Sequence, residues 1–279
     1  MGLILDGVAE MSPAQQNLAL ISAADSRTDR ANVFAYGPPG SGKSYFASTF
    51  PRPFFIDTDQ NTLTVKGRVA RGEVANFPIY QTTDWRTVLE ILTDPASRLR
   101  GLFEGTPWAG YEPQTIVIDT LSTLEGYIFD EIIDQAAKQA KVSQNTWNTL
   151  KRRMLAIARA AWNLPLNTVL LAHDQSGRSA TEDMSKKDPG PLLTGSLIKQ
   201  VPAQCDVYLY FSSRVVPGGD AEYLAHTRPT LDGMPARVNG IELPADHGVL
   251  VNPSYEMIRR ALDELEEQTK QRRNEETTR

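Results

Sequence analysis

The sequence predicts an α/β protein whose mostly parallel, twisted sheet is covered by helices on both faces. One observation behind this prediction is a series of short apolar runs, each the length of a buried strand, that alternate with segments of helical periodicity. Another is that polar residues stand at the ends of these runs, where ligands bind in open parallel sheets. The runs expected to form the main strands are residues 32–36, 53–59, 77–80, 115–120, 168–172 and 206–211.

Several segments between these runs carry helix signals. Ser12 followed by Pro13 predicts a helix that runs to about Ala24, because serine is a favoured N-cap and proline fits the first helical turn. This helix would place Leu18 and Ile21 on its inward face, with Leu20 and Ala24 as further candidates for that face. Further helices are expected over residues 44–50, 85–92, 147–162, 195–201 and 255–268.

Three stretches receive other expectations. Residues 95–113 are rich in glycine and proline, so we expect an irregular excursion there. Residues 222–227 and 240–243 are expected to add two short strands. The charged residues that follow 268 are expected to be frayed. The chain therefore divides into an N-terminal helix and lead-in (1–30), a core (31–253), and a C-terminal helix with a charged tail (254–279).

Composition limits the class of protein. The chain has 279 residues, of which 41% are hydrophobic, enough for a substantial globular core. Its net charge of -5 does not favour bulk attraction to nucleic acid, although local basic patches remain open. The single cysteine, Cys205, excludes an internal disulfide, and no apolar run approaches the length of a membrane span. The histidines show no zinc-binding spacing. We therefore expect a cytoplasmic protein without a membrane segment.

The strongest motif follows the first expected strand. The stretch Gly37-Pro38-Pro39-Gly40-Ser41-Gly42-Lys43-Ser44 has the pattern G-x-x-x-x-G-K-S of a phosphate-binding loop. Its glycines let backbone N–H groups turn toward phosphate oxygens, and the helix that follows adds the positive end of its dipole. Lys43 would reach the β- and γ-phosphates, and the hydroxyl of Ser44 would bind Mg²⁺. Together with Tyr45, which follows it, this stretch predicts a binding site for ATP and Mg²⁺. The alternative is a glycine-rich turn that contains a lysine by chance, but such a turn would lack the strand before the motif and the helix after it.

A second acidic position supports the same chemistry. The apolar run 115–118 ends in Asp119, and the carboxyl ends of parallel strands meet at one edge of a sheet. We therefore expect Asp119 to lie beside Ser44 and to hold Mg²⁺ through water. The alternative is a carboxylate that only caps the end of a buried strand.

The order of these polar strand ends resembles the ATPase core of RecA and RadA recombinases. It resembles more closely the compact RecA-like phage ATPases, often labelled AAA ATPases, that act with single-strand annealing proteins. The matching stretches are GPPGSGKS, FFIDTDQ, TIVIDTLSTL, NTVLLAHDQ and GPLLTGSLIKQVPAQCDVYLYF, within residues 31–243. The resemblance implies a RecA-like P-loop core that hydrolyses ATP to ADP and phosphate. It also implies action on single-stranded DNA in phage-type recombination or replication, assembly into a ring or filament, and a single-strand annealing or binding protein as partner.

The resemblance also assigns roles at the strand ends. The catalytic carboxylate of the family falls on Asp59, which would orient or deprotonate the attacking water. The family usually has glutamate at this position, and aspartate is one methylene shorter. Asp57 is therefore an alternative base, and either acid could instead cap a loop. The residue that senses the γ-phosphate falls on His173, with Gln175 as the alternative.

Two further features concern neighbouring molecules. The basic residue that completes the site of the next subunit falls on Arg237, with Arg228 as the alternative, and a plain surface arginine is the competing interpretation. Residues 176–191 occupy the position of the DNA-binding loop. This loop contains Arg178, Lys186 and Lys187, but nearby acids balance them and no aromatic residue is present.

Two questions about partners stay open. Lys151, Arg152 and Arg153 either form a solvated helix face, the interpretation we favour, or contact DNA. The alternative to a DNA-dependent ATPase is a P-loop switch or loader that acts on a protein partner. A small-molecule kinase would need a substrate-binding arginine cluster or a lid, and the sequence shows no obvious candidate for either.

Overall fold

The structure is a computed structural model that describes residues 29–61, 63–138, 144–175, 189–218 and 221–277. The helix expected over residues 13–24 lies outside these ranges. The described strands are β1 (Asn32–Gly37), β2 (Pro53–Asp57), β3 (Ile79–Gln81), β4 (Thr115–Asp119), β5 (Asn167–His173), β6 (Val207–Val215), β7 (Ala221–His226), β8 (Arg237–Val238) and β9 (Val249–Val251).

Within these ranges the strands form one mixed sheet in the order β3-β2-β4-β5-β1-β6-β7-β9, and β8 pairs with β6. Every pairing from β3 to β6 is parallel, whereas β7, β8 and β9 join in antiparallel pairs. β1, β2 and β4 are buried along their whole length, as expected for strands that helices cover on both faces. The predicted α/β fold with a mostly parallel sheet is confirmed.

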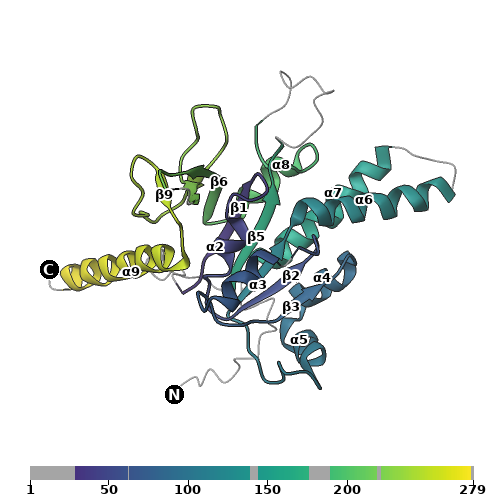
Figure 1. Cartoon of the computed structure of the whole chain (residues 1–279), viewed down its shortest axis with the longest axis horizontal. Coiled ribbons are helices and arrows are strands. Elements are labelled where there is room, and N and C mark those ends of the chain that lie inside the picture. Colours follow the sequence, from purple (N-terminus) through teal and green to yellow (C-terminus); the bar gives the residue numbers. More distant parts are fainter. Residues whose placement is uncertain (1–28, 62, 139–143, 176–188, 219–220, 278–279) are drawn as a thin grey trace, which may run out of the picture.

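Two layers of helices cover the sheet (Figure 1). The helices are α2 (Lys43–Ala47), α3 (Leu63–Ala70), α4 (Trp85–Thr93), α5 (Pro95–Phe103), α6 (Leu121–Lys138), α7 (Gln144–Trp162), α8 (Leu197–Gln200), the 3-10 turn η4 (Pro202–Gln204), and α9 (Tyr255–Thr277). Alternate strand residues enter separate cores, because successive side chains of a strand point to opposite faces. Phe34 and Tyr36 join the core under α4 to α7, whereas Val33 and Ala35 join the core under α2 and α9.

The expectation of an irregular excursion at residues 95–113 is wrong in its first half. α5 begins at Pro95, because the Asp94 carboxylate caps the helix by accepting a hydrogen bond from the N–H of Ser97 at 3.3 Å. Leu99 and Phe103 on its inner side are buried in the core. The helices α3 and α6 are likewise not among the predicted elements.

Two expectations near the C-terminus are also wrong. Residues 240–243 form a loop instead of a strand, and Gly240 has a φ of 75°, which interrupts extended backbone. The short strands β8 and β9 lie on either side of this loop. Helix α9 continues to Thr277 where frayed residues were expected, and pairs such as Arg259–Asp263 and Lys270–Glu266 support it at a spacing of four residues.

Candidate functional site

The loop between β1 and α2 lies at the carboxyl edge of the parallel strands. Gly42 is the N-cap residue of α2 and has a φ of 94°, in the left-handed region that glycine adopts without strain. A Cβ atom at Gly42 would also lie 2.5 Å from the ring of Tyr223 on β7. Only glycine therefore fits here, and Tyr223 is a neighbour of the phosphate loop that the sequence did not reveal.

Lys43 is held inside this loop. Its ammonium group donates hydrogen bonds to the carbonyl oxygens of Gly37 at 2.8 Å and Pro38 at 2.9 Å, and the residue is only 6% exposed. Burial lowers the pKa of Lys43, while the carboxylates of Asp119, Asp174 and Asp59 act in the opposite direction. The loop therefore holds the amino group of Lys43 at the position where the motif places phosphate.

Ser44 and Asp119 meet as the sequence predicts. The Ser44 hydroxyl donates a hydrogen bond of 2.6 Å to Oδ2 of Asp119. Burial raises the pKa of Asp119 to about 6, and the hydrogen bond from Ser44 opposes this shift. Hydroxyl and carboxylate oxygens are ligands that Mg²⁺ accepts, so the pair forms a candidate magnesium position.

Asp59 and His173 form a second side-chain pair. Nε2 of His173 lies 3.0 Å from Oδ2 of Asp59, and the hydroxyl of Thr120 donates to Oδ1 of Asp59 at 3.2 Å. Burial raises the pKa of Asp59, but hydrogen bonds from His173, Thr123 and Thr120 outweigh it, so the pKa lies below its ordinary value. Asp59 is therefore a carboxylate at neutral pH, in a fixed orientation.

Asp57 has a different environment. Its Oδ1 accepts hydrogen bonds from the backbone N–H groups of Asp59 at 3.1 Å and Gln60 at 2.9 Å. Its Oδ2 accepts a bond from the side-chain amide of Gln81 at 3.0 Å, and the residue is buried. Asp57 caps the turn after β2, which leaves Asp59 as the acid that faces the other strand ends.

Threonine and serine side chains join these strand ends to one another. The Thr58 hydroxyl donates to the carbonyl of Thr120 at 2.7 Å and accepts from the N–H of Thr120 at 2.9 Å. The Ser122 hydroxyl accepts a bond of 3.0 Å from the N–H of His173. These residues were missed because a threonine or serine at a strand end has no distinctive sequence signal.

A match to a protein family covers most of the chain and all the residues of this site. The family described as "AAA domain" matches residues 29–234. The chain belongs to this family. The fold of this AAA-domain protein is the RecA-like P-loop core that the sequence predicts, and the protein is a P-loop ATPase.

Several solved structures are similar to this AAA-domain protein. The flagellar accessory protein FlaH from Methanocaldococcus jannaschii has a TM-score of 0.40 and 12% identity, over 79% of this chain and 88% of that chain. An ATPase from the type III secretion system of pathogenic bacteria has a TM-score of 0.39 and 10% identity, over 65% and 51%. The protein PH0321 from Pyrococcus horikoshii has a TM-score of 0.31 and 9% identity, over 80% and 91%. No match is found among curated proteins.

Most of the expected DNA-binding loop, residues 176–188 with Arg178, Lys186 and Lys187, lies outside the described residues. Its two ends are described, and both are fixed beside the site. The N–H of Leu192 donates to the carbonyl of His173 at 2.7 Å, and Asp174 pairs with Pro191 as an isolated β-bridge. Gln175 donates to the carbonyl of Pro191 at 3.3 Å, so its side chain binds the returning chain and not Asp59.

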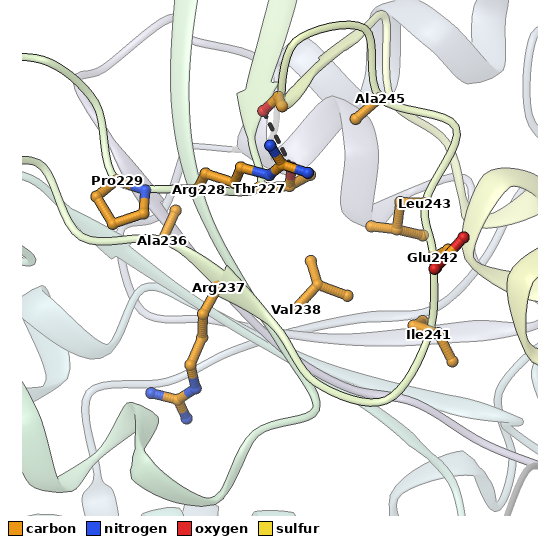
Figure 2. A pocket seen from close by; sticks show the side chains of 11 residues that line it. Thr227, Arg228, Pro229, Ala236, Arg237, Val238, Ile241, Glu242, Leu243 and Ala245 are labelled. Atoms are coloured by element: carbon orange, nitrogen blue, oxygen red, sulfur yellow. Dashed lines mark hydrogen bonds between the residues drawn. The ribbon is translucent and has the colours of Figure 1, made fainter.

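The two candidate arginines lie elsewhere in the AAA-domain protein. Arg228 and Arg237 line a hollow of about 490 Å³ together with Val238, Ile241 and Leu243 (Figure 2). The Arg237 guanidinium donates to the carbonyls of Pro202 at 2.6 Å and Ala203 at 3.1 Å. β8 pairs Arg237 with Tyr208, toward the amino end of β6 and away from the phosphate loop. A role of Arg237 at the site of another subunit stays a prediction.

The basic run on α7 is partly neutralised within the chain. Arg153 forms an ion pair of 3.2 Å with Glu131 and packs over the ring of Trp85 at 4.6 Å. Glu131 also binds Arg86, and hydrogen bonds from that guanidinium lower the pKa of Glu131 to about 2. Arg152 is exposed. This arrangement favours a paired and solvated helix face over a DNA contact.

Two searches of the described residues bear on cofactors and membranes. Among them, no group of three or more histidine, cysteine or acidic side chains could hold a metal ion. Mg²⁺ in nucleotide sites needs only one or two protein ligands besides phosphate and water, so the Ser44–Asp119 pair is sufficient. In the part of the chain that the structure covers, no helix has the length and apolar character needed to cross a bilayer.

Proposed function

We propose that this AAA-domain protein hydrolyses ATP with Mg²⁺ at the carboxyl edge of β1, β2, β4 and β5, and that it acts on single-stranded DNA. The observation that carries the ATPase part is the grouping of Lys43, the Ser44–Asp119 pair and the Asp59–His173 pair. These five side chains come from four separate strand ends and supply the cation, the metal ligands and the acid that phosphoryl transfer needs.

The residues at this edge fit a magnesium nucleotide. The hydroxyl of Ser41 is buried without a hydrogen-bond partner among the described residues, as expected for a loop that awaits a ligand. The loop N–H groups and Lys43 would bind phosphate oxygens, and Ser44 and Asp119 would hold Mg²⁺. When bound, Mg²⁺ neutralises charge that develops on the phosphates.

Asp59 would orient the attacking water and accept its proton. Its lowered pKa keeps it deprotonated, and His173 with Thr120 fixes the direction of its carboxylate. His173 would respond to the state of the phosphates, because it contacts Asp59 through its ring and Leu192 through its carbonyl. A change at the phosphates would thus reach the loop that begins at residue 176.

The DNA part of the proposal is tested by a salt titration of binding with and without ATP. We expect ATP-dependent, cooperative binding that is stronger for single strands than for duplex. The salt slope should be shallow, on the order of -0.7 per phosphate contact with only a few contacts per subunit. Lys186→Glu with Lys187→Glu should weaken DNA binding without changing nucleotide affinity. Lys66→Glu with Arg272→Glu, which makes the same charge change at exposed positions, is the matched control.

A protein partner is the second candidate, and the pairing of Arg153 with Glu131 favours it because that pairing removes a cation from the DNA surface. In this case the protein would be an ATP-driven switch or loader. If single-stranded DNA neither binds at low salt with ATP nor alters hydrolysis, this candidate replaces the DNA proposal.

Assembly into a ring or filament is also part of the proposal. Arg237 would then leave the carbonyls of Pro202 and Ala203 and stabilise the phosphoryl group at the site of the next subunit. Mixing Arg237→Ala subunits with Asp59→Asn subunits should restore part of the activity, because some interfaces pair one intact residue of each kind. No recovery in subunits shown to mix would exclude Arg237.

A further inference from the structure

An apolar groove lies at the amino-terminal edge of the sheet, opposite the nucleotide site. It encloses about 630 Å³ between α5, the segment 109–113, and the residues that precede β5. Leu99 and Phe103 on α5 form one wall, and Pro165 with Leu166 forms another. The charged residues that line the groove, Arg100, Glu104 and Glu112, are exposed and of mixed sign.

The first strand begins beside this groove. The N–H of Ala31 donates to the side chain of Asn167 at 2.9 Å, and the N–H of Thr168 donates to the carbonyl of Ala31 at 3.0 Å. Asn32 also donates to the carbonyl of Trp162 at 3.1 Å. The chain therefore enters β1 next to the loop that carries Pro165 and Leu166. The described part of the chain thus begins, at Asp29, at this edge of the sheet.

The sequence before Asp29 matches the groove in character. Residues 13–24 contain no charged side chain, and their helical spacing collects Leu18 and Ile21 on one face. An isolated helix of this length is marginal in water, so it needs a surface on which to bury that face. Residues 25–28 let Ala24 lie at most about 17 Å from Asp29. That reach is short enough to hold the segment near this edge of the sheet.

We propose that residues 13–24 bind as a helix in this groove of their own chain, with Leu18 and Ile21 against Ala96, Pro165 and Leu166, which line the groove and are not buried. The segment carries no charged side chain. Its binding beside the positive and negative residues at the rim of the groove therefore requires no ion pair and meets no charge repulsion. It covers an apolar hollow that would otherwise face water. The docking lies far from the phosphate loop and is independent of the proposed ATPase function.

Cross-linking in the full chain tests the position of the segment. Leu18→Cys with Ala96→Cys, in a Cys205→Ser background, would be treated with a short bismaleimide. Gln16→Cys with Ala96→Cys is the matched control, because Gln16 lies on the opposite side of the predicted helix. We expect a cross-link within one chain that forms at least about fivefold faster for Leu18 than for Gln16, equivalent to about 1 kcal/mol. Equal rates would overturn the proposal, and so would a cross-linked dimer, which would show that the groove binds a second copy.

Trypsin cleavage after Arg27 gives a second measurement that does not need cysteines. Leu18→Asp with Ile21→Asp should release the segment and accelerate this cleavage at least about fivefold. Gln16→Asp with Ala23→Asp adds the same charge to the outward face and should leave the rate near that of the unmodified protein. Similar acceleration by both pairs, or by neither, would contradict docking through the Leu18 face.

Discussion

The two edges of the parallel strands both bury polar side chains, but they use them differently. At the amino edge, Asn167 binds the N–H of Ala31, Thr115 donates to the carbonyl of Pro51, and Asn32 donates to the carbonyl of Trp162. Each of these side chains satisfies the backbone of a neighbouring segment. At the carboxyl edge, Ser44–Asp119 and Asp59–His173 are bonds between one side chain and another.

The difference shows that buried polarity alone does not identify a site. Buried polar groups are hydrogen-bonded in almost all folds, and the amino edge is an ordinary case. The carboxyl edge is distinguished by partly or fully buried ionisable groups with shifted pKa values. Burial raises the pKa of Asp119 and lowers that of Lys43, whereas burial raises the pKa of Asp59 but hydrogen bonds led by that of His173 outweigh it and lower the pKa. Such clusters are typical of functional sites.

The comparison between the two edges predicts its largest effect on turnover, at the neighbouring acids Asp59 and Asp57. Asp59→Asn should keep nucleotide affinity and lower turnover by roughly 10²-fold or more, the usual scale for loss of a general base. Asp57→Asn should stay within a few-fold of the unmodified rate, because an amide oxygen can still accept the bonds from Asp59 and Gln60. Steady-state phosphate release measures both variants. The reverse pattern would move the base to Asp57.

A smaller effect is expected on the stability of the nucleotide-free protein. The pKa of Asp119 rises from about 3.9 in the unfolded chain to about 6 in the fold, so its ionised form is disfavoured in the fold. The contribution of Asp119 to the free energy of unfolding is therefore fully present below about pH 4, and it is lost as the pH rises through about 6. Asp119→Asn should therefore raise the free energy of unfolding at pH 8 by up to about 3 kcal/mol, and not below pH 4.

The same variant should weaken Mg²⁺-dependent ATP binding. Urea unfolding at a series of pH values, together with nucleotide titrations with and without Mg²⁺, measures both changes. A variant that is less stable than the unmodified protein at pH 8 would show that the Asp119 charge supports the fold.

The smallest effect concerns the amino edge and should appear in stability alone. Asn167→Ala leaves the buried N–H of Ala31 without its acceptor, which should cost about 2 kcal/mol of unfolding free energy. Turnover per folded molecule should not change, since Asn167 lies at the far end of β5 from His173. A tenfold loss of turnover in the folded variant would mean that the two edges are coupled.

The sequence predicts the part of the site that depends on local pattern. The glycine spacing identifies the loop that holds Lys43, and the rule for parallel strand ends brings Asp119 to Ser44. The contact between Asp59 and His173 could not be derived in this way, because β4 lies between β2 and β5 and no local pattern encodes strand order. The hydrogen bonds of the turn at Asp57, which favour Asp59 as the proposed base, are likewise not encoded in a local pattern.

The missed elements have separate physical reasons. α5 carries the signal Asp94-Pro95, an N-cap followed by proline, but the glycines and prolines that follow it outweighed that signal. The short strands β8 and β9 are too brief to show any periodicity, and only pairing with β6 and β7 defines them. Tyr223 meets Gly42 through tertiary packing that no motif contains.

The ATP hydrolysis rate of Lys43→Ala tests the central claim most directly, because Lys43 is the cation within the phosphate loop. Lys66→Ala, which removes an exposed lysine from α3, is the matched control. If the carboxyl edge is a nucleotide site, Lys43→Ala should lower turnover by about 10²–10³-fold or more and weaken ATP binding, while Lys66→Ala should not. Equal rates for the two variants, in proteins with unchanged circular dichroism, would show that the carboxyl edge is not the site of hydrolysis.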